Sequence, residues 1–468
     1  MKKLNRKTVP MVPERPIRII QFGEGNFLRG FVDWMVDILN EKTHFNGNIQ
    51  IVQPLQKGMG AWINEQEGLY HVLLEGIEKG IKTQTTRLIT SIEGVLNPFE
   101  NYQAFLELAE NPDLEFIVSN TTEAGIVFDE KDDNPKTLPK TFPGKLTALL
   151  HQHFISFDRY PPKELKILPC ELIEKNGDKL KECVLKYIEL WNLSKDFVQW
   201  VERSVIFYNT LVDRIVPGFP KENIQAIQEK LDYEDNLVVK AEPFHLWVIE
   251  GPKKLEDLLR FKEAGLNVVF TNDLTPFRTR KVRILNGTHT AMVPIAYLNG
   301  FKEVREVVED EKMAKFLDQI IFKEIIPTLD MPKEELETYA YEVLERFKNP
   351  FIKHKLLDIS LNSISKFRVR VLPSILNYLE SYKQVPEGLA VAFTYLMVFY
   401  KGEHASQSIP IKDDETVASF FKEAWSSKDV ELTISRILSN EALWGINMEK
   451  EVLLTNFFKK KIMAITNV

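Results

Sequence analysis

A chain of 468 residues is too long for one ordinary core, so its length predicts two or three domains, each able to bury an interior. With 27% charged and 44% hydrophobic residues and no apolar run long enough to span a bilayer, the composition is that of a globular protein and excludes membrane insertion. The net charge of -7 gives no electrostatic basis for binding nucleic acid.

The N-terminal segment and the cysteines indicate the compartment. Residues 1–16 are basic but precede neither the apolar core nor the cleavage site of a signal peptide, so we expect a solvated arm. Cys170 and Cys183 show no C-x-x-C spacing, which argues against a structural zinc site and fits a reducing compartment. We therefore expect a cytoplasmic protein, and the sequence leaves open whether it is a monomer or a small homo-oligomer.

Strand and helix patterns alternate through the first part of the chain. Residues 17–23 form a short apolar run, 26–42 follow a helical period and 47–54 are again strand-like, which predicts a β-α-β unit. Further strands are expected at the start of 114–126 and at 165–172, with helices between and after them. This alternation favours an α/β fold with a doubly wound parallel sheet of the Rossmann type.

Residues 71–90 interrupt this alternation as an inserted β-hairpin with its turn at 78–80. After residue 277 strand patterns become scarce and amphipathic helical segments dominate. We expect a Rossmann-type domain over 1–275 and a mainly α-helical domain over 276–468. The predicted amphipathic segments of the second domain are 301–325, 333–348, 373–400 and 412–440.

A glycine pair follows the first strand. Gly23 and Gly25 stand between strand and helix, where small residues let a pyrophosphate approach the backbone. Leu28 holds the third position of G-x-G-x-x-G, so a plain strand-to-helix turn is the alternative. Gln53 stands where an acidic residue would hold the ribose, which leaves NAD or NADP open. The residues expected to bind the dinucleotide here are Phe22, Gly23, Gly25, Asn26, Phe27 and Gln53.

A second polar turn, residues 119–125, follows the strand that starts near 114. It would place Thr121, Thr122 and Glu123 at the carboxyl edge of the sheet, where ligands of open α/β sheets bind. We include the three among the cofactor-binding residues. An ordinary helix-capping loop is the alternative.

Three polar residues interrupt an apolar helical pattern at the start of the second domain. Thr275 and Pro276 are a suitable start for a helix that runs at least through Ala291. At about 100° per residue, Lys281, Asn286 and His289 share one sector with apolar residues. The opposite face, expected to lie nearer solvent, carries Arg280, Arg283 and Gly287.

Each of the three could be structural alone, but together they favour a catalytic site. An apolar cleft disfavours the ammonium form of a lysine, which suits Lys281 to proton exchange near neutral pH. The chemistry indicated is general acid/base catalysis without a metal. His151 and His153 fall in a helical pattern, so we expect no metal site there either.

With these residues in hand, the chain resembles the mannitol dehydrogenase family of polyol-specific long-chain dehydrogenases over nearly its full length. The motif K-x4-N-x2-H, here Lys281, Asn286 and His289, is specific to that family. Three further stretches resemble its tagaturonate reductase (altronate oxidoreductase) branch: "PCELIEKNGDKL" (169–180), "SNTTEAG" and "KFRVRVLPS" (366–374). The general family matches are "FGEGNFLRGFVDW", "FPGKLT" (142–147), "LVDRIVP" (211–217) and "EPFHLWVIEG" (242–251).

The resemblance implies an active site between the two domains and metal-independent hydride transfer with NAD(H). Lys281 would be the general acid/base, Asn286 would polarise the carbonyl, and His289 would orient substrate and lysine. Asp213 matches a substrate contact of the family, with a structural Asp-Arg pair as the alternative. Leu172 departs from the family, because polyol-type members carry there an asparagine that donates to the carbonyl.

The leading hypothesis is an NAD-dependent interconversion of D-tagaturonate and D-altronate. The substrate's carboxylate calls for a fixed cation, expected among Lys366, Arg368 and Arg370. An extended segment would put these three on one face, whereas a helix would spread them apart. The alternatives are a polyol 2-dehydrogenase or fructuronate reductase of the same family, and a dinucleotide-sensing protein without turnover.

Overall fold

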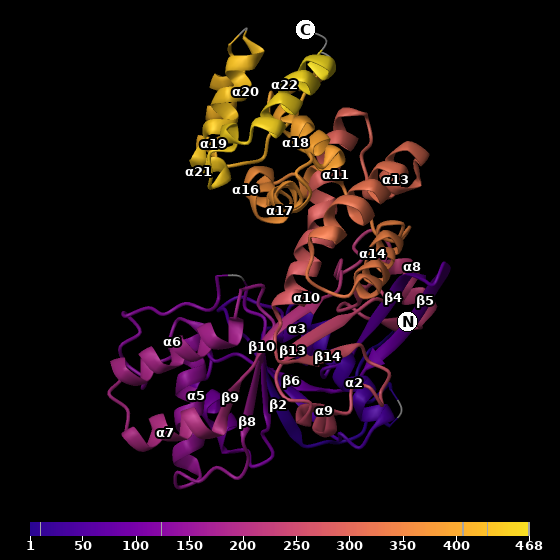
Figure 1. The fold of residues 1–468 in the computed structure, drawn as a ribbon. Coiled ribbons are helices and arrows are strands. Elements are labelled where there is room, and N and C mark those ends of the chain that lie inside the picture. The colour runs from indigo at the N-terminus through magenta and orange to yellow at the C-terminus, as the bar shows by residue number, and fades with distance from the viewer. Residues whose placement is uncertain (10, 123, 405–406, 428, 467–468) are drawn as a thin grey trace. The chain divides into compact units, whose positions relative to one another are not determined.

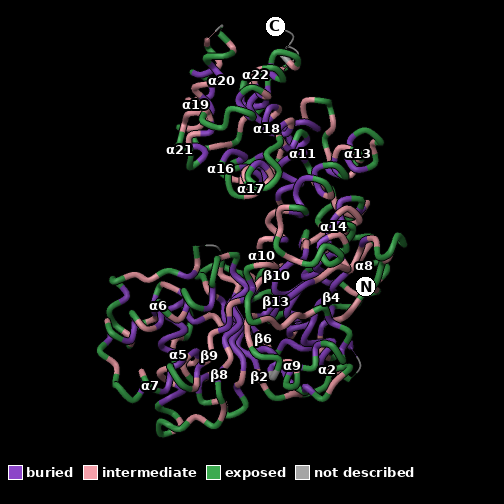
Figure 2. Tube along the Cα trace, viewed as in Figure 1, coloured by how far each residue is buried: buried purple, intermediate pink, exposed green. Residues whose placement is uncertain are grey.

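The computed structural model describes residues 1–468 apart from 10, 123, 405–406, 428 and 467–468. The chain forms two compact units (Figure 1). The first comprises Met1–Gly76 and Lys82–Leu274, and the second comprises Ile77–Ile81 and Thr275–Val468. Each unit has an interior of its own, because buried residues line the strands of the first and the facing sides of helices in the second (Figure 2).

A six-stranded parallel sheet forms the centre of the first unit, with the strand order β6-β3-β2-β7-β8-β9. The first strand of this sheet along the chain is β2, in the middle. Strands β3 and β6 follow on one side of it, and β7, β8 and β9 follow on the other side. The order reverses between β2 and β7, and ligands of such sheets bind beyond the carboxyl ends at this point. The strands are β2 (Ile17–Phe22), β3 (Asn48–Val52), β6 (Ile92–Leu96), β7 (Phe116–Ser119), β8 (Leu165–Pro169) and β9 (Val205–Phe207).

Helices cover both faces of this sheet, which is why its strands are apolar on both sides. Ile19 packs into the cluster beneath α2 and α9, whereas Ile20 and Phe22 pack into the cluster beneath α4 to α7. The predicted Rossmann-type sheet is therefore confirmed. The helices of the first unit are α1 (Asn26–Arg29), α2 (Val32–Lys42), α3 (Gly60–Glu65), α4 (Tyr102–Glu107), η1 (Leu108–Glu110), α5 (Phe142–Ser156), α6 (Asn176–Leu190), α7 (Lys195–Ser204), α8 (Ile224–Leu231) and α9 (Lys254–Leu259).

The predicted hairpin is confirmed, and its strands are β4 (Tyr70–Glu78) and β5 (Ile81–Ile89). Its turn residues Lys79 and Gly80 both have positive φ, 51° and 79°, as a two-residue hairpin turn requires. The tip, Ile77–Ile81, belongs to the second unit, where the backbone N–H groups of Lys79 and Gly80 donate to the Glu345 carboxylate. The smaller sheets are β12 (Val239–Ala241) with β4 and β5, β10 (Asn209–Asp213) with β13 (Leu246–Glu250) and β14 (Val268–Thr271), and β1 (Lys2–Lys3) with β11 (Tyr233–Glu234).

The second unit is mainly helical, as predicted, with α11 packed on α18, α15 and α16. Both α11 and α18 are apolar on nearly all sides because they lie inside the unit. Over the residues described, no helix is both long and apolar enough to cross a membrane. The elements are α10 (Thr275–Arg280), η2 (Lys281–Asn286), α11 (Gly287–Leu298), α12 (Val304–Glu309), α13 (Glu311–Asp318), η3 (Gln319–Ile325), η4 (Ile326–Thr328), α14 (Lys333–Phe347), α15 (Leu356–Ile359), α16 (Ser363–Arg370), α17 (Leu372–Tyr382), α18 (Glu387–Phe399), β15 (Glu403–His404), β16 (Gln407–Ser408), α19 (Glu415–Ala424), α20 (Val430–Ser439), α21 (Glu441–Trp444), η5 (Met448–Lys450) and α22 (Val452–Thr466).

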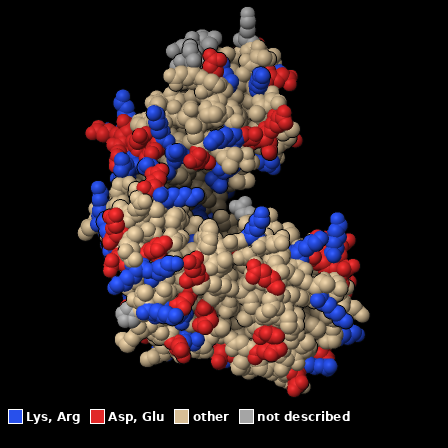
Figure 3. All heavy atoms as spheres, turned by 180° about the vertical axis from the view of Figure 1, so that it is seen from behind, with Lys and Arg blue, Asp and Glu red and all other residues tan. Residues whose placement is uncertain are grey.

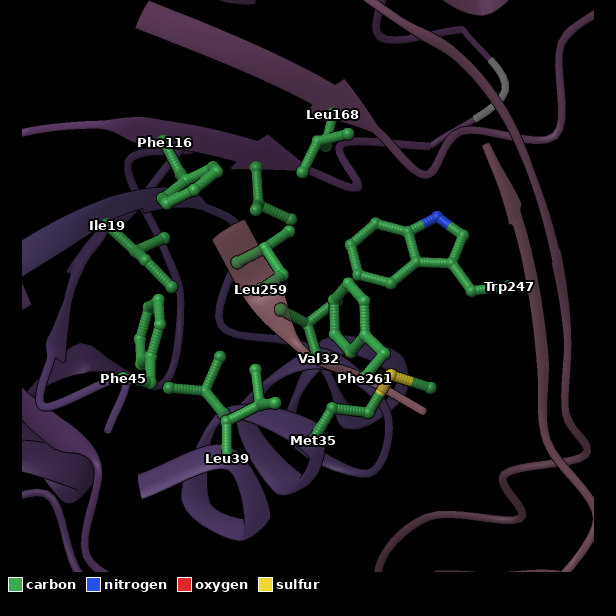
Figure 4. A pocket seen from close by; sticks show the side chains of 12 residues that line it. Ile19, Val32, Met35, Leu39, Phe45, Phe116, Leu168, Trp247, Leu259 and Phe261 are labelled. Atoms are coloured by element: carbon green, nitrogen blue, oxygen red, sulfur yellow. The ribbon is translucent and has the colours of Figure 1, made fainter. Parts of the chain in front are cut away.

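A small cavity of about 20 Å³ lies in the core of the first unit (Figure 4). Apolar side chains line it, among them Ile19, Val32, Leu259 and Phe261. An apolar space of this size stays dry and holds no ligand, so it is a packing gap and not a binding site. On the face shown in Figure 3, lysine, arginine and acidic side chains are interspersed, without the single-sign field of a nucleic-acid-binding surface.

Candidate active site

The two positions after β2 that carry glycine differ in why a side chain would be unfavourable there. Gly23 has a φ of +121°, and a Cβ atom there would lie 2.9 Å from the carbonyl oxygen of Asn120. Gly25 has an ordinary φ of -68° and is the N-cap residue of α1, and a Cβ on it would meet nothing within 4 Å. Gly23 is thus needed for the tight turn at the point where the strand order reverses, and Gly25 leaves the backbone open to a ligand.

A buried arginine that the sequence analysis did not identify holds this turn. Arg29 is fully buried, and its guanidinium donates to the Glu24 carbonyl oxygen (3.1 Å), the Leu237 carbonyl oxygen (2.6 Å) and Asn26 Oδ1 (2.8 Å). These bonds fix the first turn of the helix against the rest of the unit. An arginine inside an otherwise apolar helix segment was the signal available in the sequence.

The other residues predicted around the turn lie in different surroundings. The Phe22 side chain is fully buried against Phe105 and Phe142, so only its backbone borders the turn. The Phe27 ring, partly buried, stacks on Phe31. The Gln53 side chain donates to the carbonyl oxygens of residues 55 and 56 and accepts from the N–H of residue 60, so it shapes the loop after β3.

The turn after β7 lies beside the glycine turn. The Asn120 N–H donates to the Phe22 carbonyl oxygen at 3.0 Å, and Thr121 follows half-buried. Thr122 has a φ of 102°, a conformation that a β-branched residue rarely adopts and that tends to occur at functional sites. Glu123 lies outside the described residues. Leu172, beyond the next strand, is 59% exposed.

The predicted helix from Thr275 is present, but it contains a π-helical segment at Lys281–Asn286. In a π-helix a turn closes between residues five apart, and the Gly287 N–H accordingly bonds to the Val282 carbonyl oxygen. Lys281 and Asn286, five residues apart, therefore lie one turn above each other, and His289 follows three residues later on the α-helix. The π-segment aligns the three side chains better than a regular helix would.

His289 is enclosed by aromatic rings. Its imidazole stacks on Phe347 at 4.1 Å between ring centroids and meets the edge of His354 at 4.8 Å. Burial lowers the pKa of His289 well below 6.5, and His354, Arg346 and Arg370 lower it further, so the ring is neutral at pH 7. Its Nε2 is buried and has no hydrogen-bond partner among the described residues. A neutral ring with an unused nitrogen can donate to or accept from a substrate hydroxyl.

The prediction that Arg280, Arg283 and Gly287 form a solvent-facing side is wrong. Arg280 is 9% exposed and lies over the rings of Phe277 (5.2 Å) and Tyr339 (4.3 Å). Gly287 is buried because α16 passes close to it: a Cβ there would lie 3.0 Å from the Arg370 carbonyl oxygen. Arg283 is partly buried and donates to the Val369 carbonyl oxygen, and burial lowers its pKa to about 10. Helices α14 and α16 cover this face, which a single helical pattern does not reveal.

The three cations predicted to hold a carboxylate lie on a helix, α16, and their side chains take separate directions. Lys366 donates to the Ile359 carbonyl oxygen, and Arg368 donates to the Ala442 carbonyl oxygen. Arg370 is bonded to the hydroxyl of Thr290 (3.4 Å), the residue after His289. The structure thus brings Arg370 alone of the three next to the helix that carries the catalytic candidates.

Asp213, predicted to contact substrate, is buried at the end of β10. The guanidinium of the next residue, Arg214, donates to the carbonyl oxygens of Glu242 and Gly30 and lies 4.1 Å from the Trp34 ring. Arg346 and His354, which surround His289, were not identified from the sequence. Their positions next to the site depend on how α14 and the loop after it pack, and local sequence carries no signal for that.

The strand order, the glycine turn at its reversal point and the helical second unit define a Rossmann-type two-domain protein. Residues 17–263 match the Mannitol dehydrogenase Rossmann domain, and residues 273–466 match the Mannitol dehydrogenase C-terminal domain. The chain belongs to the mannitol dehydrogenase family and is an oxidoreductase of that family, as the sequence motifs had predicted.

Relatives of similar length share close to half of its residues. An altronate oxidoreductase of Phocaeicola vulgatus is 45% identical over 470 residues, covering 99% of this chain and 97% of the relative. An altronate oxidoreductase of Bacillus subtilis is 46% identical over 458 residues, covering 97% and 94%.

Two solved structures have a similar fold. A ternary complex of Pseudomonas fluorescens mannitol 2-dehydrogenase with NAD and D-mannitol has a TM-score of 0.72 at 23% identity, covering 99% of this chain and 96% of that one. A substrate-free D-sorbitol dehydrogenase has a TM-score of 0.82 at 22% identity, covering 97% and 93%. At these identities the likeness concerns the fold.

Proposed function

We propose that this protein is an NAD-dependent reductase that interconverts D-tagaturonate and D-altronate. The first unit would bind the dinucleotide, and the second would bind the sugar acid and supply the proton donor. The observation that carries the proposal is the π-helical segment that aligns Lys281 with Asn286, followed by His289 one turn later. The relatives named altronate oxidoreductase support the choice of substrate.

The glycine turn of the first unit fits a dinucleotide. The open side of Gly25 leaves room for a pyrophosphate, and Gly23, Asn26 and Phe27 would border it. Thr121 and Thr122 would hold the second nucleotide half, whereas Gln53 would act through the loop that it shapes. When bound, NADH supplies a hydride from C4 of its nicotinamide.

Lys281 is the proposed proton donor in reduction. As the substrate's carbonyl carbon receives the hydride, the Lys281 ammonium gives a proton to the carbonyl oxygen, which yields the alcohol. In oxidation the neutral lysine takes that proton back. Asn286, whose backbone carbonyl oxygen accepts from Thr290 Oγ1, would donate a side-chain N–H to the same substrate oxygen. Neutral His289 would orient a neighbouring hydroxyl.

The proposed chemistry requires no metal, because a lysine already supplies the acid. Among the described residues, no group of three or more His, Cys, Asp or Glu side chains could hold an ion.

Asp213 is proposed to contact a substrate hydroxyl.

The substrate's carboxylate requires a cation in the second unit, and two guanidinium groups qualify. Arg370 lies beside Thr290, next to His289 in the chain. Arg280 is buried against two aromatic rings, and its Nε has no hydrogen-bond partner among the described residues. A planar guanidinium fork matches a carboxylate better than a lysine does, which favours either arginine over Lys366.

The test is NADH oxidation by the purified protein with D-tagaturonate, D-fructuronate and D-fructose. The proposal predicts the highest kcat/KM for tagaturonate and a much lower value for the neutral ketose. A preference for fructose would instead indicate a polyol 2-dehydrogenase, and a preference for fructuronate the related reductase. NADH binding without turnover of any of these would indicate a dinucleotide sensor.

A further inference from the structure

A buried carboxylate joins the ends of β7 and β8. Glu171 is 2% exposed and lies two residues after Pro169, the last residue of β8. Its two oxygens accept hydrogen bonds from Ser119 Oγ, from the Thr121 backbone N–H and from Thr121 Oγ1, each at 3.0 Å. The donors are the last residue of β7 and a residue of the turn that follows it, so one side chain from the segment after β8 sets the course of this turn.

The turn has little conformational freedom and needs such an anchor. Thr122 has a φ of 102°, and a Cβ on Gly125 would lie 2.0 Å from Thr121 Oγ1. Backbone conformations of this kind persist only where the surroundings hold them. The Thr121 N–H can only donate, so it needs an acceptor in that place. Burial raises the pKa of Glu171, and the bonds from Thr121 and Ser119 oppose that rise.

The position in the sheet indicates which half of a dinucleotide this turn would hold. In a sheet of this order, the half around β2, β3 and β6 carries the glycine turn and binds the first mononucleotide. The turn after β7 belongs to the other half, which holds the second mononucleotide, in NADH the nicotinamide and its ribose. Asn120, at the start of the turn, also donates to the Cys170 carbonyl oxygen (2.8 Å), so the two residues after β8 each support the turn.

We propose that Glu171 is a positioning residue that holds Thr121 and Thr122 in place for the nicotinamide half of the cofactor. This inference rests on the proposed function, because it takes NADH as the ligand. Glu171 itself would not touch the cofactor, since its oxygens are buried and used by the turn. Its loss should therefore weaken binding of the nicotinamide half and leave the adenosine half unaffected.

The test compares two ligands that differ in the nicotinamide. NADH and ADP-ribose are titrated by calorimetry into wild-type protein and into Glu171→Gln, which keeps the shape but replaces one acceptor oxygen by a donor NH2 group. We expect the dissociation constant of NADH to rise on the order of tenfold or more and that of ADP-ribose to stay within about twofold. Hydrogen exchange of the cofactor-free variant should show lost protection at Thr121.

Glu324→Gln is the matched control. Glu324 is also a buried carboxylate that accepts two backbone N–H groups, from Gly388 and Leu389, but it lies in the second unit. The variant Glu324→Gln should leave the dissociation constants of NADH and ADP-ribose unchanged. If Glu171→Gln does not fold, Ser119→Ala is used in its place, because it removes only one of the three hydrogen bonds. The dissociation constant of NADH should then rise by a smaller factor.

Equal weakening of both ligands by Glu171→Gln would show a merely structural role and overturn the inference. So would unchanged binding of NADH in a folded variant. If the wild-type protein bound ADP-ribose and NADH equally well, the turn would hold no nicotinamide, and the inference would also fail. If the wild type bound neither ligand, the proposed function itself would be wrong.

Discussion

Alanine at Gly25 should separate cofactor binding from stability. Gly25 has backbone angles that any residue adopts, φ -68° and ψ 164°, and its added Cβ would meet no atom within 4 Å. The free energy of unfolding should therefore change by less than about 1 kcal/mol, with a small gain possible from a stiffer unfolded chain. If the pyrophosphate lies against this backbone, the methyl group occupies its space, and the dissociation constant of NADH should rise at least about tenfold.

Alanine at Gly23 should have the opposite main effect. A φ of +121° strains an L-residue, and the Cβ would lie 2.9 Å from a backbone oxygen, that of Asn120, which cannot move aside easily. Strain of roughly 1 to 3 kcal/mol plus the steric clash predicts a loss of about 2 to 4 kcal/mol in the free energy of unfolding. Loss of NADH binding would follow from the distorted turn.

Urea unfolding and fluorescence titration with NADH measure both effects on the same samples. The reasoning is refuted if Gly25→Ala binds NADH as tightly as the wild type, because the open side of Gly25 would then not face the cofactor. It also fails if the two variants lose equal stability, because the structure assigns the steric conflict to Gly23 alone.

Three further predictions address the substrate, the metal and pH. Replacing Arg370 or Arg280 by methionine should lower kcat/KM for tagaturonate about ten- to a hundredfold, with little change for fructose. The control Arg436→Met removes a surface cation paired with Glu423 and should change neither value. Equal losses with both substrates would contradict carboxylate recognition. Dialysis against EDTA should leave the rate unchanged, and a loss restored by zinc or manganese would refute metal independence. Burial raises the pKa of Asp33 to about 7, so the folded state keeps a proton that the unfolded chain releases near pH 4. Wild-type stability should therefore fall as the pH rises from about 4 to about 7, by up to ~1.4 kcal/mol per pH unit, and Asp33→Asn should lack this part of the fall in urea unfolding; equal pH slopes would exclude an ionisation cost at Asp33.

Local sequence patterns predicted the elements of the first unit well. Apolar runs that end in glycine or polar turns marked β2, β3, β7 and β8, because strands buried on both faces are continuously apolar. The hairpin turn at Lys79 and Gly80 was likewise predictable from the local sequence. The π-helical segment was not predictable from periodicity, because a local widening of the helix leaves the order of polar and apolar residues unchanged.

The candidate site was predictable only as far as its motifs extend. Lys281, Asn286 and His289 stand together in one short stretch, so their association could be inferred. Arg346 and His354 reach His289 through the packing of α14 and the following loop, and Glu171, after β8, reaches Thr121, after the adjacent strand β7. These are tertiary contacts between residues far apart in the chain. The burial of Arg280 was missed for the same reason, since the covering ring, Tyr339, belongs to α14.

The central claim is that Lys281 is the proton donor, and Lys281→Met tests it most directly. The variant removes the ammonium group but leaves the glycine turn of the first unit untouched. NADH titration and NADH oxidation with D-tagaturonate should be measured on the same preparation. The account predicts wild-type affinity for NADH together with loss of turnover by several orders of magnitude, because the carbonyl oxygen receives no proton. Turnover near the wild-type rate in a variant that binds NADH would contradict it.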